Sequence, residues 1–174
     1  MSAAEVVKEW SLAFIRQADA DFRAYELYEM YPDSLAAECH KLQFLQMACE
    51  KACNALVLTS GIHSSDDVQS SHGYIRKHLP TIIKQEMSFS VQNYKALMRP
   101  YKNICLLAGE IEKLNPSMDR DQRPENCEYP WASGNEVQSP LDWQFEATKL
   151  LMIASGRTFL KTFRLAINRL LNER

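Results

Sequence analysis

The stretch LAAECHKLQFLQMACEKACNALVLT, residues 35–59, decides the fold because its apolar side chains recur at steps of three and four residues. One stripe of apolar or small side chains consists of Leu35, Cys39, Leu42, Leu45, Cys49, Ala52 and Leu56. A second, more polar stripe at the same spacing consists of His40, Gln43, Met47, Glu50 and Asn54. Alanines in this stretch permit a neighbouring helix to approach closely, and Gly61 is suited to end the helix. The stretch therefore predicts a long, packed helix.

Helical periodicity also continues through the sequence on both sides of this stretch. We expect further helices over residues 2–30, 72–87, 91–114 and 142–172. The chain contains only five glycines, which is fewer than strand-and-turn proteins need. The sequence therefore predicts an all-α fold, an antiparallel up-and-down bundle of four or five helices.

Local signals mark where the first two of these helices begin and end. Ser2 and Glu5 fit a capping box at the start of the first helix. The pair Tyr31-Pro32 ends it, because the residue before a proline is pushed out of the helical region. Asp33 or Ser34 is the expected N-cap of the next helix, since short polar side chains accept bonds from the first free N–H groups.

Other features interrupt the helical pattern further along the chain. Pro80 predicts a kink or a division into two short helices, and Pro100 predicts a bend. The polar residues 63–71 predict a loop, and the pair Ser155-Gly156 predicts a break in the last helix.

Residues 115–141 contain four of the seven prolines and show no periodicity. A segment of this length without regular structure is long for a loop in a compact domain, and long loops are often functional. Tyr129, Trp131 and Val137 predict that this insert packs against the helices. We therefore expect an ordered, proline-rich insert before the last helix.

Composition and charge exclude several classes of protein. With 174 residues, 46% of them hydrophobic, the chain fits one domain over residues 1–174. The net charge of −2 argues against a generic DNA-coating protein, which needs a large basic excess. No apolar run approaches the roughly 20 residues of a membrane span, and residues 1–9 lack the pattern of a secretory signal. We expect no association with a membrane.

The five cysteines are an odd number without paired spacing and form a poor disulfide framework. Cys49 and Cys53 would share one face of a helix, but a zinc site needs two further ligands at similar spacing. We interpret the cysteines as small buried side chains in a reducing compartment. No phosphate-binding loop, dinucleotide fingerprint or zinc-protease motif is present in the sequence. The sequence predicts a cytoplasmic protein without a metal or cofactor.

Charge is distributed unevenly between the two ends of the chain. Residues 1–38 contain eight acidic and three basic residues, whereas residues 155–174 contain five basic residues and one acidic residue. In one interpretation the two ends are helices with complementary surfaces, and each ion pair between them contributes little to stability. In the other, the last helix presents a basic strip to phosphate or RNA. Arg157, Lys161 and Arg164 are then the candidate binding residues.

Three segments of the sequence form an ordered set: RQADADFRA at residues 16–24, QMACEKACNAL at residues 46–56, and the pair Ser71-His72. Together they resemble the HEPN family, the nucleotide-binding domains shared by higher eukaryotes and prokaryotes. The resemblance spans roughly residues 10–85. It implies a homodimer, a role in a prokaryotic toxin–antitoxin or phage-defence system, and a nucleotidyltransferase-type protein as a partner.

The chain departs from this family at the residues that matter for catalysis. Ribonucleases of the family carry an Arg-x4–6-His motif near the last helix, and none of the four histidines here follows an arginine at that spacing. Phe44 stands where the family often has a histidine, and the insert exceeds that of a minimal member. The resemblance therefore implies a variant without the usual ribonuclease site.

Candidate site residues come from the chemistry of metal-free RNA cleavage, which needs a base near the 2′-hydroxyl and a cation for the phosphorane charge. His72 and Arg157 are weak candidates for these roles. His72 could equally be a helix cap or a surface residue. Arg157 fits either a phosphate in a groove or an ion pair with Glu128 that pins the insert.

Asn126 and Glu128 lie between prolines, in a loop whose rigidity would position polar groups for binding. In the alternative interpretation these polar side chains only cap the ends of helices. The first functional hypothesis is a HEPN-like, homodimeric module that binds RNA, a nucleotide or a protein partner. The alternatives are an RNA-cleaving enzyme with a rearranged site, and a helical protein–protein interaction scaffold.

Overall fold

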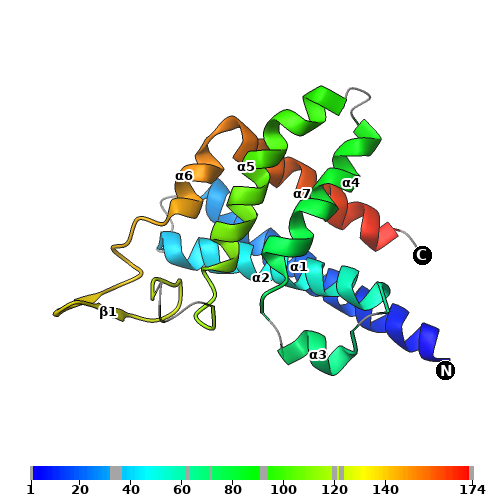
Figure 1. Ribbon diagram of the computed structural model, residues 1–174, viewed down its shortest axis with the longest axis horizontal. Helices are drawn as coiled ribbons and strands as arrows, with labels where there is room; N and C mark the ends of the chain where they lie inside the picture. The colour runs from blue at the N-terminus through cyan, green and yellow to red at the C-terminus, as the bar shows by residue number, and fades with distance from the viewer. Residues whose placement is uncertain are drawn as a thin grey trace.

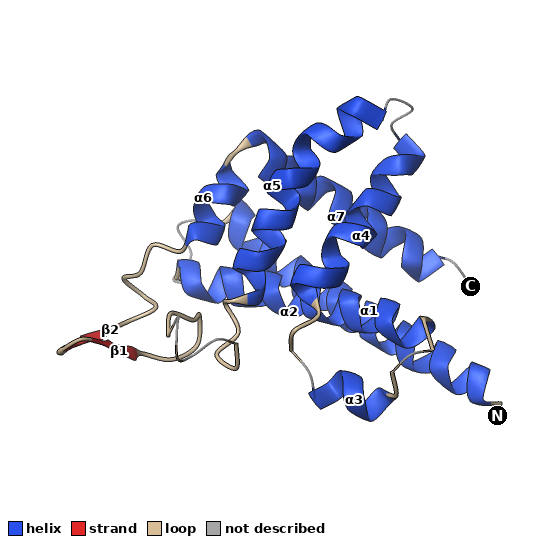
Figure 2. Cartoon of the chain, viewed as in Figure 1, coloured by secondary structure: helices blue, strands red, loops and turns tan. Residues whose placement is uncertain are grey.

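The computed structural model describes residues 2–31, 37–61, 63–70, 72–90, 94–118, 121 and 124–172. These ranges contain seven α-helices and one two-stranded antiparallel sheet (Figures 1 and 2). Five of the helices have 16 or more residues. The predicted all-α bundle is confirmed.

Helices α1 (Ala3–Met30) and α2 (Glu38–Thr59) form one antiparallel pair (Figure 1). The capping box is confirmed, because the Ser2 hydroxyl accepts from the Glu5 N–H while the Glu5 carboxylate accepts from the Ser2 N–H. Helix α1 ends before Pro32, as expected. Asp33 and Ser34, the expected caps of α2, lie outside the described residues.

Helices α4 (Ile75–Ser90) and α5 (Tyr94–Glu112) form a second pair, which crosses the first in Figure 1. Pro80 lies inside α4, which continues through it, so of the two predicted outcomes, a kink or a division into two short helices, the division is wrong. Apolar side chains on both sides of Pro80 are fully buried and fix this segment on the core: Ile75, Leu79 and Ile83.

Part of the predicted loop over residues 63–71 is the short helix α3 (Ser65–Ser70), so this prediction is wrong for those residues. Ser64 and Asp67 cap each other's backbone N–H groups at its start, at 3.0 and 3.2 Å. Val68 anchors the helix, because its fully buried side chain packs in a cluster with Val57 and Leu58. The polar composition of residues 63–71 predicted a loop, although the single apolar residue Val68 anchors a helix there.

The last segment of the chain forms α6 (Glu146–Met152) and α7 (Ala154–Asn172), which meet at Ile153. The break in the structure therefore lies two residues before the predicted pair Ser155-Gly156. Gly156 is buried inside α7, and a Cβ atom there would lie 2.2 Å from the Leu150 carbonyl oxygen. Gly156 therefore does not interrupt the helix. It allows the backbones of α6 and α7 to approach closely at the corner between them.

The insert projects from the bundle as a small hairpin of strands β1 (Trp131–Ser133) and β2 (Glu136–Gln138) (Figure 2). Gly134 allows the turn with a φ of +62°. Trp131 is buried and packs edge-on against Trp143, at a centroid distance of 5.3 Å. Tyr129 and Val137 are 57% and 80% exposed. The prediction that all three apolar residues pack down holds only for Trp131.

One hydrophobic cluster draws buried side chains from α1, α2, α4, α5, α6 and α7. At its α1–α7 side, the Phe22 ring meets Phe163 edge-on at 5.0 Å, and Phe163 stacks on Phe159 at 5.7 Å. Aromatic pairs in these geometries add stability beyond the area that they bury. The first and last helices of the chain are therefore held on the same core.

We expect Gly156→Ala to lower the free energy of unfolding by about 1–3 kcal/mol, because the added methyl group overlaps the backbone of α6. Gly109→Ala is the matched control inside α5, where a Cβ atom would meet only the Arg76 side chain at 3.9 Å. There the better helix propensity of alanine raises the free energy of unfolding by about 0.5–1 kcal/mol. Urea unfolding of both variants measures the difference, and a stabilised Gly156→Ala would contradict the close contact.

Candidate functional site

Arg164, a candidate phosphate-binding residue, lies between α7 and α1 and is bound within the chain. Its guanidinium group pairs with both oxygens of Glu26, at 3.0 and 2.6 Å, and also bonds Asp19. The same group lies 4.7 Å from the centre of the Phe22 ring. Arg164 therefore neutralises acidic residues of α1, as the interpretation of complementary helices predicts.

The remaining cations of α7 divide into two groups. Arg169 is half-buried and pairs with Glu86 of α4 at 2.7 Å. Lys161 and Arg157 are exposed, and Arg157 donates a hydrogen bond to the Met152 carbonyl at the end of α6. The last helix therefore presents only part of its positive charge to solvent.

Asn126 has a structural role, but it bonds within its own loop and does not cap the end of a helix, as the alternative to binding had predicted. Its side-chain oxygen accepts from the N–H groups of Glu128 and Tyr129, at 2.8 and 2.7 Å. Its amide group donates to the carbonyls of Pro124 and Tyr129. Glu128 is exposed, and within the described ranges no hydrogen bond or ion pair joins it to Arg157. The hydrogen bonds of Asn126 therefore fix the conformation of this loop.

His72 lies just before α4, where its Nδ1 atom is 3.0 Å from Oε1 of Glu50 on α2. The other oxygen, Oε2, accepts from Gln46 at 2.7 Å and from Asn115 at 3.2 Å. We call these four side chains the Glu50 cluster. They bring together the middle of α2, the segment before α4 and the segment after α5.

The Glu50 cluster holds an imidazole in a defined orientation. A proton on Nδ1 satisfies the bond to the carboxylate and leaves Nε2 as an acceptor, the arrangement of a general base supported by a carboxylate. Nε2 has no hydrogen bond with any residue that the structure describes, and about a third of the His72 side chain is exposed. The sequence predicted His72, but not Glu50 or Asn115 as its supports.

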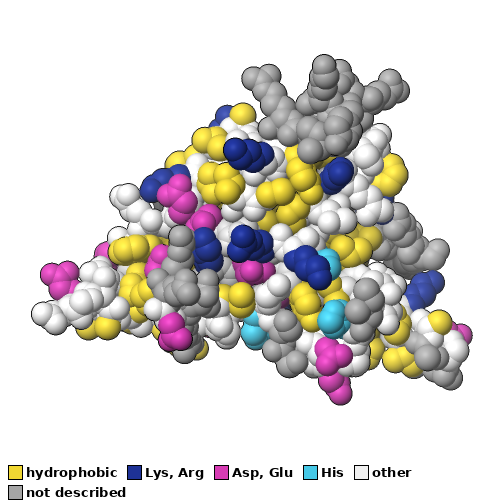
Figure 3. Space-filling model, in the orientation of Figure 1, with side chains coloured by type: hydrophobic (Ala, Val, Ile, Leu, Met, Phe, Trp, Pro, Cys, Tyr) yellow, Lys and Arg dark blue, Asp and Glu magenta, His cyan; other side chains and the backbone are white. Residues whose placement is uncertain are grey.

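Free cations lie on α4 and α5 in addition to the exposed Arg157 and Lys161 of α7. Residues 72–118 contain seven basic and three acidic residues. Each acidic side chain has a partner in the chain: Glu86 pairs with Arg169, Glu110 with Lys113, and Glu112 accepts from the Arg76 backbone N–H at 2.8 Å. Figure 3 shows basic side chains spread over this face of the molecule.

Arg76, Lys77 and Lys102 are exposed on these two helices, and no ion pair within the described residues engages them. We call these three side chains the α4–α5 cations. Arg76 and Lys77 stand in the first turn of α4, directly after the segment that carries His72. The charges of residues 72–118 carry the signal for this excess, whereas the uneven charge of the two ends of the chain predicted a surface on α7.

The buried cysteines are poor candidates for an alternative chemistry. All five are free thiols, and four of them are buried. Burial raises the pKa of the Cys53 thiol well above its usual value, and the neighbouring carboxylates of Glu112 and Glu50 raise it further. A protonated, buried thiol is a poor nucleophile. No group of three or more His, Cys, Asp or Glu side chains in the described ranges is placed to hold a metal ion.

We expect Arg164→Ala to lower the free energy of unfolding by about 2–3 kcal/mol, because Asp19 and Glu26 lose a half-buried partner. Lys161→Ala is the control on the same helix, and its exposed side chain predicts a change below about 0.5 kcal/mol. Guanidinium unfolding curves measure both. Equal effects of the two substitutions would show that Arg164 has no structural role.

Comparison of the chain with protein-family models, with curated proteins and with solved structures found no match. None of the helices in the described ranges is long and apolar enough to cross a membrane. The function of the chain must therefore be inferred from its own side chains, and the Glu50 cluster and the α4–α5 cations are the strongest basis for that inference.

Proposed function

We propose that this protein is a HEPN-like, homodimeric module that binds RNA or a nucleotide on the face of α4 and α5. The observation that carries this proposal is the set of unpaired α4–α5 cations beside the Glu50 cluster. The resemblance of residues 16–24 and 46–56 to the HEPN family supports it independently. The proposed setting is a cytoplasmic toxin–antitoxin or phage-defence system with a nucleotidyltransferase-type partner.

Phosphate binding requires cations that are not already neutralised within the protein. The guanidinium group of Arg76 can donate two parallel hydrogen bonds to a phosphate, and Lys77 and Lys102 add point charges. Acidic side chains would repel a phosphate, but those on α4 and α5 are occupied by Arg169, by Lys113 and by the backbone. The face of α4 and α5 therefore combines accessible positive charge with little competing negative charge.

The homodimer in this proposal rests on the second stripe of α2. His40 is exposed on that stripe, and Gln43 and Met47 are only partly buried. Met47 is an adaptable apolar side chain of the kind common at interaction surfaces. The part of this stripe near the start of α2 combines polar and apolar groups that the described chain covers only in part, which suits a contact with a second copy.

We expect the double variant Lys77→Ala/Lys102→Ala to weaken binding to single-stranded RNA and to lower the salt dependence. The slope of log K against log salt falls by about 0.7 for each lost phosphate contact. The matched control is Arg157→Ala/Lys161→Ala, which removes two exposed cations of α7. Fluorescence anisotropy over a range of salt concentrations measures both variants.

If the control variant loses affinity and the α4–α5 variant does not, α7 is the binding surface and the proposed face is wrong. If neither variant nor the unmodified protein binds RNA or nucleotides, the proposal fails. The helical interaction scaffold is then the remaining hypothesis.

A second candidate function is metal-free RNA cleavage, which the Glu50–His72 pair favours specifically. In that reaction Nε2 of His72 accepts the proton of a ribose 2′-hydroxyl, and the oxygen attacks the adjacent phosphorus. The products are a 2′,3′-cyclic phosphate and a 5′-hydroxyl that takes up a proton. Arg76 is the nearest exposed arginine in sequence for stabilising the phosphorane charge.

We expect His72→Gln to abolish any cleavage of transfer or messenger RNA, and Glu50→Gln to reduce it at least about tenfold by loosening the imidazole. His63→Gln is the matched control, because His63 is a partly exposed histidine before α3 that belongs to neither the Glu50 cluster nor the α2 stripe, and it keeps the rate of the unmodified protein. Gel electrophoresis after incubation without metal measures cleavage. RNA that stays intact at high protein concentration would exclude the enzyme and leave the binding module.

A further inference from the structure

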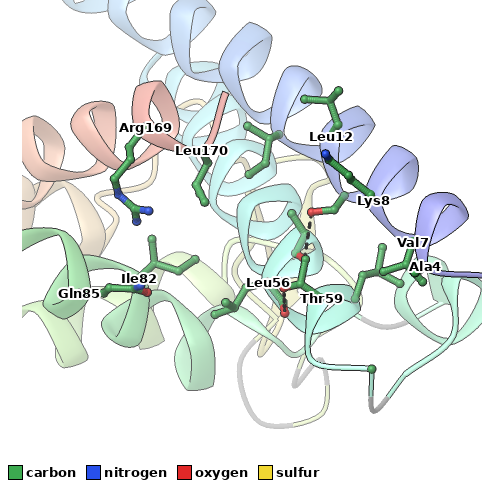
Figure 4. A pocket seen from close by; sticks show the side chains of 15 residues that line it. Ala4, Val7, Lys8, Leu12, Leu56, Thr59, Ile82, Gln85, Arg169 and Leu170 are labelled. Atoms are coloured by element: carbon green, nitrogen blue, oxygen red, sulfur yellow. Dashed lines mark hydrogen bonds between the residues drawn. The ribbon is translucent and has the colours of Figure 1, made fainter. Parts of the chain in front are cut away.

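A groove of about 540 Å³ lies between the N-terminal half of α1, the C-terminal end of α2, and helices α4 and α7 (Figure 4). None of the residues that line it belongs to the α4–α5 cations or to the Glu50 cluster. Its apolar lining consists mainly of Val7, Leu12, Ile15, Leu58, Ile82 and Leu170. Grooves of this size, lined mainly by apolar side chains and enclosed by helices of a bundle, are typical of small-molecule sites.

The hydroxyl groups that line the groove are already bonded within α1 and α2. Ser11 donates to the Ala55 carbonyl at 3.3 Å, and Thr59 donates to the Leu56 carbonyl at 2.8 Å. Figure 4 shows the bond between Thr59 and Leu56 at the α2 side of the groove. Because these donors are occupied, the groove offers apolar contact along its length and few free polar groups.

Charge at the groove is of one sign. Of the described side chains that line it, Lys8 and Arg169 are cations and none is acidic. Figure 4 shows them on opposite sides of the groove, with Leu56 and Leu170 between them. Arg169 is held by Glu86, whereas Lys8 is exposed and has no ion pair with any described residue. Lys8 is therefore the cation available to a ligand.

We propose that this groove binds a fatty acid, with the acyl chain along the apolar lining and the carboxylate paired with Lys8. An acyl chain needs no hydrogen bonds, which fits a lining whose hydroxyl groups are occupied. A carboxylate at one end fits the single free cation at the rim. A peptide helix would instead bring backbone and polar groups that this lining does not satisfy.

Calorimetric titration of the full chain with octanoate, decanoate and dodecanoate tests the proposal. We expect affinity to rise about fourfold for each added methylene, which corresponds to about 0.8 kcal/mol for each buried group. Dodecanol, which has the same chain without the charge, is expected to bind at least about tenfold more weakly than dodecanoate, because it lacks a charge-assisted bond.

Two substitutions, Lys8→Glu and Val7→Trp, distinguish the contribution of the carboxylate to the affinity from that of the acyl chain. Lys8→Glu is expected to lower the affinity for dodecanoate about tenfold or more and to leave dodecanol unchanged. Lys161→Glu, with the same change of charge on the exposed face of α7, leaves both unchanged. Val7→Trp fills the groove from a half-buried position and is expected to abolish binding of both. Circular dichroism confirms that each variant is folded.

The proposal is overturned if dodecanoate does not bind, if affinity is independent of chain length, or if Lys8→Glu binds dodecanoate as tightly as the unmodified protein. It is also overturned if folded Val7→Trp retains full affinity. A groove occupied by a second copy would give a dimer that Val7→Trp dissociates and no binding of dodecanoate. RNA binding by the α4–α5 cations is measured separately, so each proposal can fail alone.

Discussion

The complete burial of one face of α2 is the constraint on which the rest of the structure depends. Twelve of its residues are buried, and six of them show the main face: Leu42, Leu45, Ala48, Cys49, Ala52 and Cys53. Four of these six are alanine or cysteine, which bring neighbouring backbones close to the helix. Helices α1, α3, α4 and α5 all contact α2. The positions of both helical pairs are therefore set by the small side chains of this one helix.

A carboxylate on such a central helix must be paired, because burying an unpaired charge is costly. Glu50 meets this requirement by accepting from Gln46, His72 and Asn115. The same bonds orient an imidazole at the surface and connect three segments that are distant in the sequence. The candidate site is thus a consequence of how the core accommodates one acidic side chain.

Electrostatic pairing also determines which surfaces remain available to ligands. Arg164 forms ion pairs with Asp19 and Glu26, and Arg169 forms one with Glu86. Part of the charge at the two ends of the chain is therefore neutralised within the protein. The α4–α5 cations lack such partners among the described residues. The distribution of free charge therefore differs from the distribution of charge along the sequence, and it moves the proposed RNA surface from α7 to α4 and α5.

The sequence by itself determined the local features of this protein. The period of apolar residues, the capping box of Ser2 and Glu5, and the stop before Pro32 act within a few residues, so they predicted α1, most of α2 and the all-α class. Only the tertiary structure determined which residues distant in the sequence are in contact. Asn115 reaches Glu50 across 65 positions, and Arg164 reaches Asp19 across 145. The groove likewise needs four helices to enclose it. Such contacts depend on how helices pack, and the local patterns that define each helix do not specify its neighbours.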